Sequence, residues 1–200
     1  MKKPVFLPIL TILLAAALLL GLSFGLNGLA AANAREEHLQ MMRMLLPGSE
    51  EFTLEPYSGE DANIRSVHKA ENGFVIETVT YGYAGEITML IGVSNEGTVT
   101  GLVVRDMSET PGLGGEGLTD HVFLSQFLNT PGTFAVGTPG QADAFSGATQ
   151  SASSDTEAEN YVDALTGATV TSKAIVRCVN SAVAYVTGAD AGTAATSWGG

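Results

Sequence analysis

The stretch Phe74-Val-Ile-Glu-Thr-Val-Thr-Tyr81 begins the part of the sequence that decides the fold. It is rich in β-branched and aromatic residues, which favour a β-strand. Ile87-Thr-Met-Leu-Ile-Gly-Val93 and Thr98-Val-Thr-Gly-Leu-Val-Val104 have the same character, and Ser94-Asn-Glu-Gly97 between them supplies turn residues. The three runs are closely spaced, whereas a parallel pair of strands would need a crossover of about a dozen residues. We therefore predict an antiparallel meander.

An amphipathic helix is expected nearer the C-terminus, with Thr171 or Ser172 as its N-cap and Gly188 at its end. The apolar residues between them follow the i, i+3, i+4 spacing of a helix that buries one face. They are Ile175, Val176, Val179, Ala182, Val183 and Val186. Together with the meander, this helix predicts the α+β class, with one antiparallel sheet and flanking helices.

The rest of the chain divides around this domain. We expect a membrane anchor at 1–34, a helical or irregular connector at 35–70, the folded domain at 71–188 and a flexible tail at 189–200. In the connector, a helix over 35–46 is expected to end at Pro47-Gly48. In the domain, we expect a short helix at 122–128, a brief strand at 133–136 and an acidic linker at 151–160.

The N-terminal region predicts a membrane-spanning helix. Lys2 and Lys3 precede an apolar run over 4–32, and no charge appears before Arg35. The run covers the roughly 20 residues that a spanning helix needs. The alternative is a cleaved signal peptide, because Ala32-Asn33-Ala34 resembles a cleavage site, but the apolar core of a signal peptide is usually about 7–15 residues. In either case the domain is expected outside the cytoplasm, with the two lysines on the inner side.

Composition excludes several classes of function. The formal net charge of −12 argues against nucleic-acid binding, which needs a basic face. The single cysteine, Cys178, excludes an internal disulfide and is expected to pack as a small apolar residue. Three histidines with no ligand spacing make a metal centre unexpected. The sequence also has no glycine-rich dinucleotide motif that follows a strand and opens a helix.

The segment Asp163-Ala-Leu-Thr-Gly-Ala-Thr-Val-Thr171 places the Thr169 hydroxyl on a turn of small residues just before the expected helix. Gly167 and Ala168 leave room for a bulky group to approach this hydroxyl. The start of a helix offers unpaired N–H groups and the positive end of the helix dipole, which favour a phosphate. Taken alone, this segment is also compatible with an ordinary capped turn.

The same segment resembles the flavinylation motif of the FMN-binding domain family, in which an aspartate precedes Ser/Thr-Gly-Ala-Thr. Other parts of that family's pattern occur in the same order: Tyr81-Gly-Tyr-Ala-Gly85, Ile91-Gly-Val93, Gly97, Glu109-Thr-Pro-Gly-Leu-Gly114 and Thr171-Ser-Lys-Ala-Ile175. Within the family, the chain is similar to the G subunits of Rnf-type ion-translocating ferredoxin:NAD oxidoreductase complexes. The C subunit of the sodium-translocating NADH:quinone reductase is a relative of these subunits.

The resemblance implies FMN joined through its phosphate to Thr169 as a phosphoester. A separate flavin transferase would make this bond from FAD with magnesium. Asp163 and Thr166, with Gly167 and Ala168, would then form the motif that the transferase recognises. A second set of residues would lie against the flavin: Glu109, Thr110, Gly112, Leu113 and Gly114. Both sets are also compatible with ordinary turn-forming roles.

A second copy of the motif, Asp143-Ala-Phe-Ser-Gly-Ala-Thr149, lies 20 residues earlier. Thr149 is therefore a possible second acceptor. The residues that follow it, Gln150-Ser-Ala-Ser-Ser-Asp155, have no apolar helical face. Since a phosphate on Thr149 would lack the helix start that follows Thr169, we expect Thr169 to be the acceptor.

The resulting expectation is an electron carrier with no substrate site of its own. It would be one subunit of a redox-driven ion translocase, anchored by a single span in the cell membrane, with its C-terminal domain outside and the other membrane subunits of an Rnf-type complex as partners. Two alternatives remain open from the sequence. One is an anchored FMN domain that serves another extracytoplasmic reductase, and the other is an anchored binding module without redox activity.

Overall fold

The computed structural model describes residues 6–108, 121–137 and 159–188, and within the first helix it describes side chains at 13–18 and from 32 onward. The expected tail at 189–200 and nearly all of the expected linker at 151–160 lie outside these residues. The chain divides into two compact units, Met1–Met41 and Met42–Gly200.

The first unit contains most of α1 (Phe6–Leu45). The helix ends just before Pro47 and Gly48, as predicted, and Gly48 has a positive φ of 89°. No helix within the described part of the chain is both long and apolar enough to cross a membrane.

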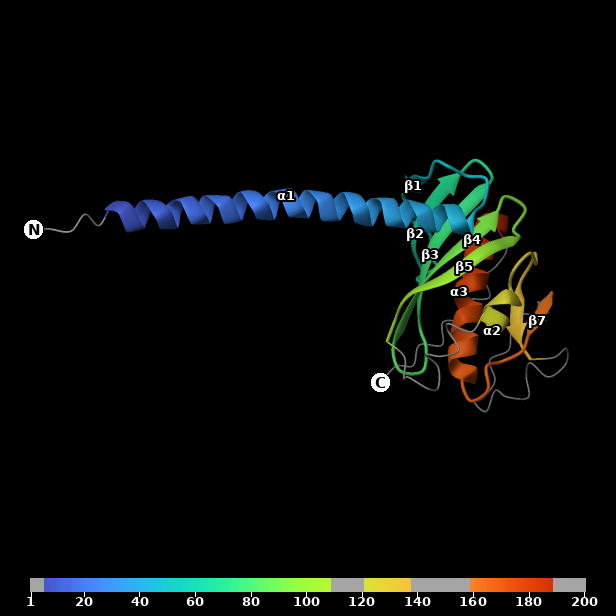
Figure 1. The fold of residues 1–200 in the computed structure, drawn as a ribbon. Coiled ribbons are helices and arrows are strands. Elements are labelled where there is room, and N and C mark those ends of the chain that lie inside the picture. Colours follow the sequence, from blue (N-terminus) through green and yellow to red (C-terminus); the bar gives the residue numbers. More distant parts are fainter. Residues whose placement is uncertain (1–5, 109–120, 138–158, 189–200) are drawn as a thin grey trace, which may run out of the picture. The chain divides into compact units, whose positions relative to one another are not determined.

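The second unit is built on a five-stranded antiparallel sheet in which the strands follow one another in sequence order (Figure 1). Short turns join β2 to β3, β3 to β4 and β4 to β5, so the predicted meander and the α+β class are confirmed. The strands are β1 (Thr53–Glu55), β2 (Ile64–Ala70), β3 (Gly73–Tyr81), β4 (Glu86–Ser94) and β5 (Val99–Met107).

Two of these strands were not predicted. The region 35–70 was expected to be helical or irregular, yet β1 and β2 extend the sheet beyond β3. The reason for the miss lies in β2, where the register shifts between Ile64 and Ser66. This irregularity puts Ile64 and Val67 on the core side at a spacing of three, and Ala70 is buried on the opposite face. The alternation typical of a strand is therefore absent from the sequence.

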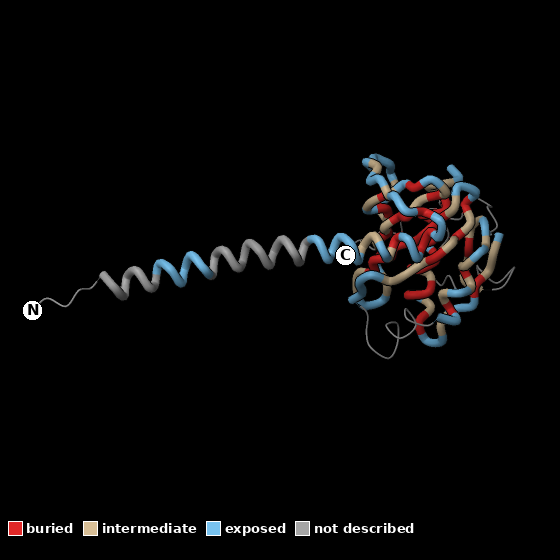
Figure 2. The backbone as a smooth tube through the Cα atoms, turned by 45° about the horizontal axis from the view of Figure 1, so that its top comes forward, coloured by how far each residue is buried: buried red, intermediate tan, exposed pale blue. Residues whose placement is uncertain are grey.

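The main core lies between the sheet and α3 (Thr169–Thr187), which crosses β3 and β4 (Figure 1). Alternate residues of the interior strand β4 point toward the helix. Buried positions gather in the interior of the domain (Figure 2). The helix contributes Ala174, Ile175, Cys178, Val179, Ala182 and Val183, and β4 contributes Ile87, Met89, Ile91 and Val93. The predicted apolar face is therefore the buried face, and Gly188 ends the helix in the left-handed conformation, as predicted.

A smaller group of elements packs beside α3. The expected short helix is α2 (His121–Ser125), and the expected brief strand is β6 (Phe134–Val136). The sequence did not predict β7 (Asn160–Val162), which pairs in parallel with β6. The Asn180 side chain of α3 holds β6, because its amide accepts from Phe134 N–H and donates to Phe134 C=O, both at 2.9 Å.

The last turn of α1 belongs to the second unit and lies against the sheet face opposite α3. Gly92 of β4 and Gly101 of β5 are directly paired, and the Leu45 backbone lies over them. A Cβ at Gly92 would lie 2.2 Å from Leu45 O, and one at Gly101 would lie 2.8 Å from Leu45 Cα. The Thr100 hydroxyl donates to Leu45 C=O at 2.6 Å. We call this set of contacts between Leu45, Gly92, Thr100 and Gly101 the Leu45 contact.

Gly92→Ala should lower the free energy of unfolding of the domain by about 1–3 kcal/mol, the usual cost of forcing extra atoms into a packed contact. Thr100→Val, which removes only the hydrogen bond, should cost about 1 kcal/mol. Chemical denaturation monitored by circular dichroism measures both, with the exposed Thr53→Val as the control. Equal unfolding midpoints for Gly92→Ala and the wild type would contradict the close packing of the Leu45 backbone on Gly92.

Candidate functional site

The motif turn leads directly into α3, and Thr169 is the first residue of that helix. The helix therefore begins two residues before the earlier of the two predicted N-caps. Ala168 occupies the N-cap position, and its methyl group offers no hydrogen bond to the first turn. The prediction that Thr171 or Ser172 caps the helix is wrong, because both side chains are buried within its first turn.

The Ser172 hydroxyl instead joins the helix to the turn that precedes it. It accepts a hydrogen bond from Leu165 N–H and donates one to Ala168 C=O, both at 3.0 Å. A backbone bond from Ala168 N–H to Leu165 C=O, also 3.0 Å, closes the same turn. Because Ser172 is almost completely buried, these bonds are shielded from water and hold Thr169 at a defined position.

Two features of this turn fit a phosphate on Thr169. The N–H groups of the first helical turn have no carbonyl partner within the helix, and no side chain caps them. Gly167 has a φ of 76°, and a Cβ there would meet no atom of the described residues within 4 Å, so these residues leave space open beside the turn. Donors and space together are what an anion needs at a helix start.

The other predicted motif residues lie on the same turn. Asp163 and Thr166 are exposed, whereas Ala168 is buried. Asp163 follows β7 directly, and its N–H donates to the Gln126 side chain at 2.8 Å. The motif is thus fixed at one end by the residues after α2 and at the other by Ser172. An exposed acid and hydroxyl on a rigid turn are accessible to an enzyme that recognises the motif.

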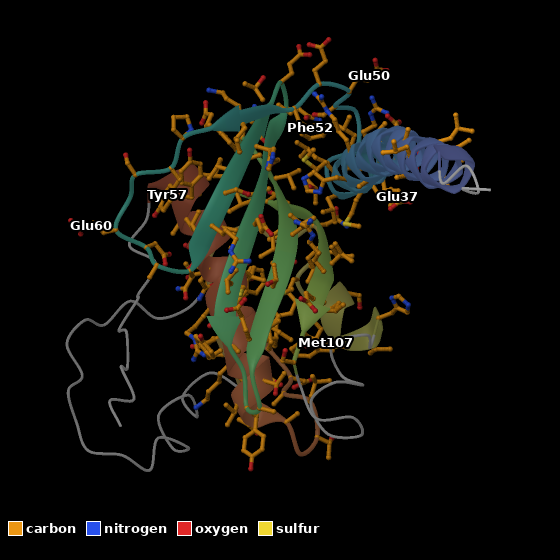
Figure 3. The ribbon with its side chains drawn as sticks, turned by 90° about the vertical axis from the view of Figure 1, so that its left-hand side faces the viewer. Glu37, Glu50, Phe52, Tyr57, Glu60 and Met107 are labelled. Carbon is orange, nitrogen blue, oxygen red and sulfur yellow. The ribbon has the colours of Figure 1, made fainter. Side chains whose placement is uncertain are left out.

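The hairpin between β3 and β4 lies at the same end of the domain as the start of α3 (Figures 1 and 3). Arg177 of α3 donates to Tyr81 C=O at the end of β3, at 3.0 Å. The side chains of Tyr81 and Tyr83 are both 71% exposed, and Met107, labelled in Figure 3 at the end of β5, is 37% exposed. This end of the sheet therefore offers apolar surface near Thr169.

Sequence reasoning did not identify Lys173 and Arg177 as part of the site. They follow Thr169 at intervals of four residues, which places all three along one side of α3. The i, i+4 spacing was visible in the sequence. The contact between Arg177 and Tyr81 was not, because it joins residues 96 positions apart.

The remaining predicted site residues lie outside the described residues. They are Glu109, Thr110, Gly112, Leu113, Gly114 and Thr149. A surface hollow of about 700 Å³ occurs elsewhere, between the segment after α1 and β2. Its lining carries Glu50, Glu51, Glu55 and Glu71 with Lys69. This acidic surplus opposes an anionic ligand, so the hollow is not the phosphate site.

Comparison with known proteins identifies a family and several relatives of this chain. The FMN-binding domain profile matches residues 82–184. The G subunit of the ion-translocating oxidoreductase complex of Methanosarcina acetivorans is 34% identical over 163 residues, which are 76% of each chain.

The G subunit of the Na⁺-translocating ferredoxin:NAD⁺ oxidoreductase complex of Acetobacterium woodii is 33% identical over 56% of this chain. The proton-translocating counterpart of Clostridium ljungdahlii is 32% identical over 57%. The alignments span only 47% and 53% of these two relatives. Among solved structures, the C subunit of the Na⁺-translocating NADH-quinone reductase from Parabacteroides distasonis superposes with a TM-score of 0.42 at 25% identity, over 62% of this chain and 60% of that one.

Ser172→Ala should loosen the turn that carries Thr169. It leaves Leu165 N–H without its partner, and an unsatisfied buried donor costs about 1–3 kcal/mol. We expect faster amide hydrogen exchange at Leu165 and Ala168, together with a lower unfolding midpoint. Ser125→Ala, which removes an exposed hydroxyl that bonds to Val122 C=O, is the matched control. Unchanged exchange at Leu165 would contradict the role of the Ser172 hydroxyl.

The Cys178 thiol should be inert in the folded protein. Its side chain is fully buried, as the predicted packing role requires, and burial raises its pKa from 9.0 to about 11. At pH 8 this leaves about a hundredfold less thiolate than in the unfolded chain. Iodoacetamide should therefore label the protein only after unfolding in urea. Because the folded pKa is the higher one, the neutral thiol stabilises the fold below pH 9, and this contribution is lost between pH 9 and 11. Rapid labelling without urea would contradict the prediction that the Cys178 thiol is inert in the folded protein.

Proposed function

Because this chain belongs to the FMN-binding domain family, we propose that it is a membrane-anchored electron-transfer subunit that carries covalent FMN in an ion-translocating ferredoxin:NAD oxidoreductase complex. The observation that carries the proposal is the position of Thr169 at the uncapped start of α3, inside the segment that matches the family. When bound, the flavin would supply one- and two-electron chemistry. The protein would supply attachment, position and electrostatic environment.

The proposed attachment is a phosphoester on Thr169. The Thr169 hydroxyl would bond to the phosphorus of the FMN half of FAD, AMP would leave, and the hydroxyl proton would be released. A flavin transferase with magnesium would carry out this step, and Asp163 and Thr166 are the residues it would recognise. The fit of the turn supports the site, because it offers backbone donors at the start of α3 and open space beside Gly167.

The proposed setting is the outer face of the cell membrane. Lys2 and Lys3 followed by an apolar run support an N-terminal anchor with the domain outside. The names of the three similar G subunits support assembly with other subunits of such a complex. A covalent bond suits this location, since it would prevent loss of FMN from an exposed surface.

The loop with Glu109, Thr110, Gly112, Leu113 and Gly114 is proposed to lie against the flavin, as the resemblance implies. Tyr81 and Tyr83 are exposed and add aromatic surface at this end of the domain. Thr149 remains a proposed second acceptor. Its sequence context lacks the apolar helical face that follows Thr169, so Thr169 is the preferred position.

Intact mass after co-expression with a flavin transferase tests the attachment. The wild type should gain one FMN unit, Thr169→Val should gain none, and Thr169→Ser should keep the unit because it retains a hydroxyl. Thr149→Val is the matched control in the second motif copy and should resemble the wild type. Two units on the wild type would mean that both copies are acceptors, and an unmodified wild type would refute covalent flavin attachment.

A further inference from the structure

We infer that Lys173 is the counter-ion of the phosphate on Thr169, with Arg177 extending the same positive strip along α3. The inference rests on the proposed function, since it assumes the anionic phosphodiester at Thr169. It assigns a cofactor-binding role to a residue outside the attachment motif. It also explains how a strongly acidic protein accepts an anion at this position.

The distribution of charge singles out these two residues. The chain has 21 acidic and 9 basic side chains, so a basic residue has many possible partners. On the sheet, each arginine or lysine that the structure describes is paired with a glutamate: Arg65 with Glu86 at 3.3 Å, Lys69 with Glu55 at 3.4 Å, and Arg105 with Glu77 at 3.0 Å. Within the described residues, neither Lys173 nor Arg177 has a carboxylate partner, so the positive charge on α3 is left uncompensated.

The geometry directs this charge toward Thr169. Residues four apart on a helix lie on the same side with Cβ atoms about 5–6 Å apart, which is within the reach of a lysine side chain. Lys173 is one turn beyond Thr169 and is partly exposed, so its ammonium group is free to turn toward a group on the Thr169 oxygen. Arg177 is one turn further along and is already fixed to Tyr81 C=O. It adds positive potential without competing for the phosphate.

The helix start and the lysine would act together on the phosphate. The N–H groups of the first turn face the anion from the end of the helix, and Lys173 approaches it along the helix side. Asp163 is the nearest acid along the chain. It lies before the turn and is exposed, so solvent weakens its repulsion. Lys173, one turn from the acceptor, therefore adds a positive charge beside Thr169 that no carboxylate within the described residues neutralises.

Phosphorus-31 NMR of the flavin-loaded full chain tests the inference directly. Lys173→Gln should shift the resonance of the attached phosphodiester, and Lys173→Arg should restore it because the charge is kept. Lys69→Gln, which removes a lysine from the ion pair with Glu55, is the matched control and should leave the resonance unchanged. A resonance that is equally unaffected by Lys173→Gln and Lys69→Gln would overturn the assignment.

A second readout is the initial rate of flavin attachment to the unloaded full chain by transferase, FAD and magnesium, followed by intact mass. Lys173→Gln should be about two- to fivefold slower at low ionic strength, the size expected for one exposed contact between charges. The difference should shrink in high salt. If the attachment rate of Lys173→Gln were reduced by the same factor at low and high salt, the electrostatic role of Lys173 would be contradicted. An unmodified wild type would instead refute the proposed covalent attachment, and undiminished attachment to Thr169→Val would refute Thr169 as the acceptor, so these failures are distinguishable from failure of the inference.

Discussion

Burial of one face of α3 against β3 and β4 determines where the other described parts of the domain lie. The helix supplies the apolar residues that complete the core, and its Asn180 side chain holds β6. Its first turn carries Thr169, and Ser172 ties that turn to the preceding motif. Because the core side of the helix is fixed by packing, the opposite side is fixed as well, and that side carries Thr169, Lys173 and Arg177.

This arrangement separates the structural and chemical roles of neighbouring side chains. Thr171 and Ser172 are buried, whereas Thr169 is partly exposed. The difference follows from helical periodicity, since residues two apart point to nearly opposite sides. A short polar sequence can therefore both stabilise a turn and present one hydroxyl for modification. The net charge of −12 makes the local positive strip more important, because long-range repulsion would otherwise oppose an anionic group.

Sequence reasoning succeeded where burial leaves a regular pattern. Strands β3, β4 and β5 were predictable because they are rich in β-branched residues and joined by short turns, and α3 because its buried face repeats at helical spacing. It failed for β2, where an irregular register removes the alternation, and for β7, a three-residue strand next to an acidic segment. Thr169 was predicted as the acceptor mainly through the resemblance, and this role stays a prediction. The start of α3 was misplaced because a residue with a capping hydroxyl, Thr171 or Ser172, was expected at the N-cap, whereas Ala168 occupies it.

The pairing of Gly92 with Gly101 beneath Leu45 has an evolutionary consequence. Neither glycine can acquire a side chain while the backbone at Leu45 stays in place, since the nearest atoms would lie 2.2 and 2.8 Å away. Relatives that carry larger residues at either position must therefore lift or reroute the chain at the position of Leu45. Gly92 and Gly101 are therefore expected to be kept or replaced together among relatives, and a replacement is expected to accompany a different backbone path at the end of α1.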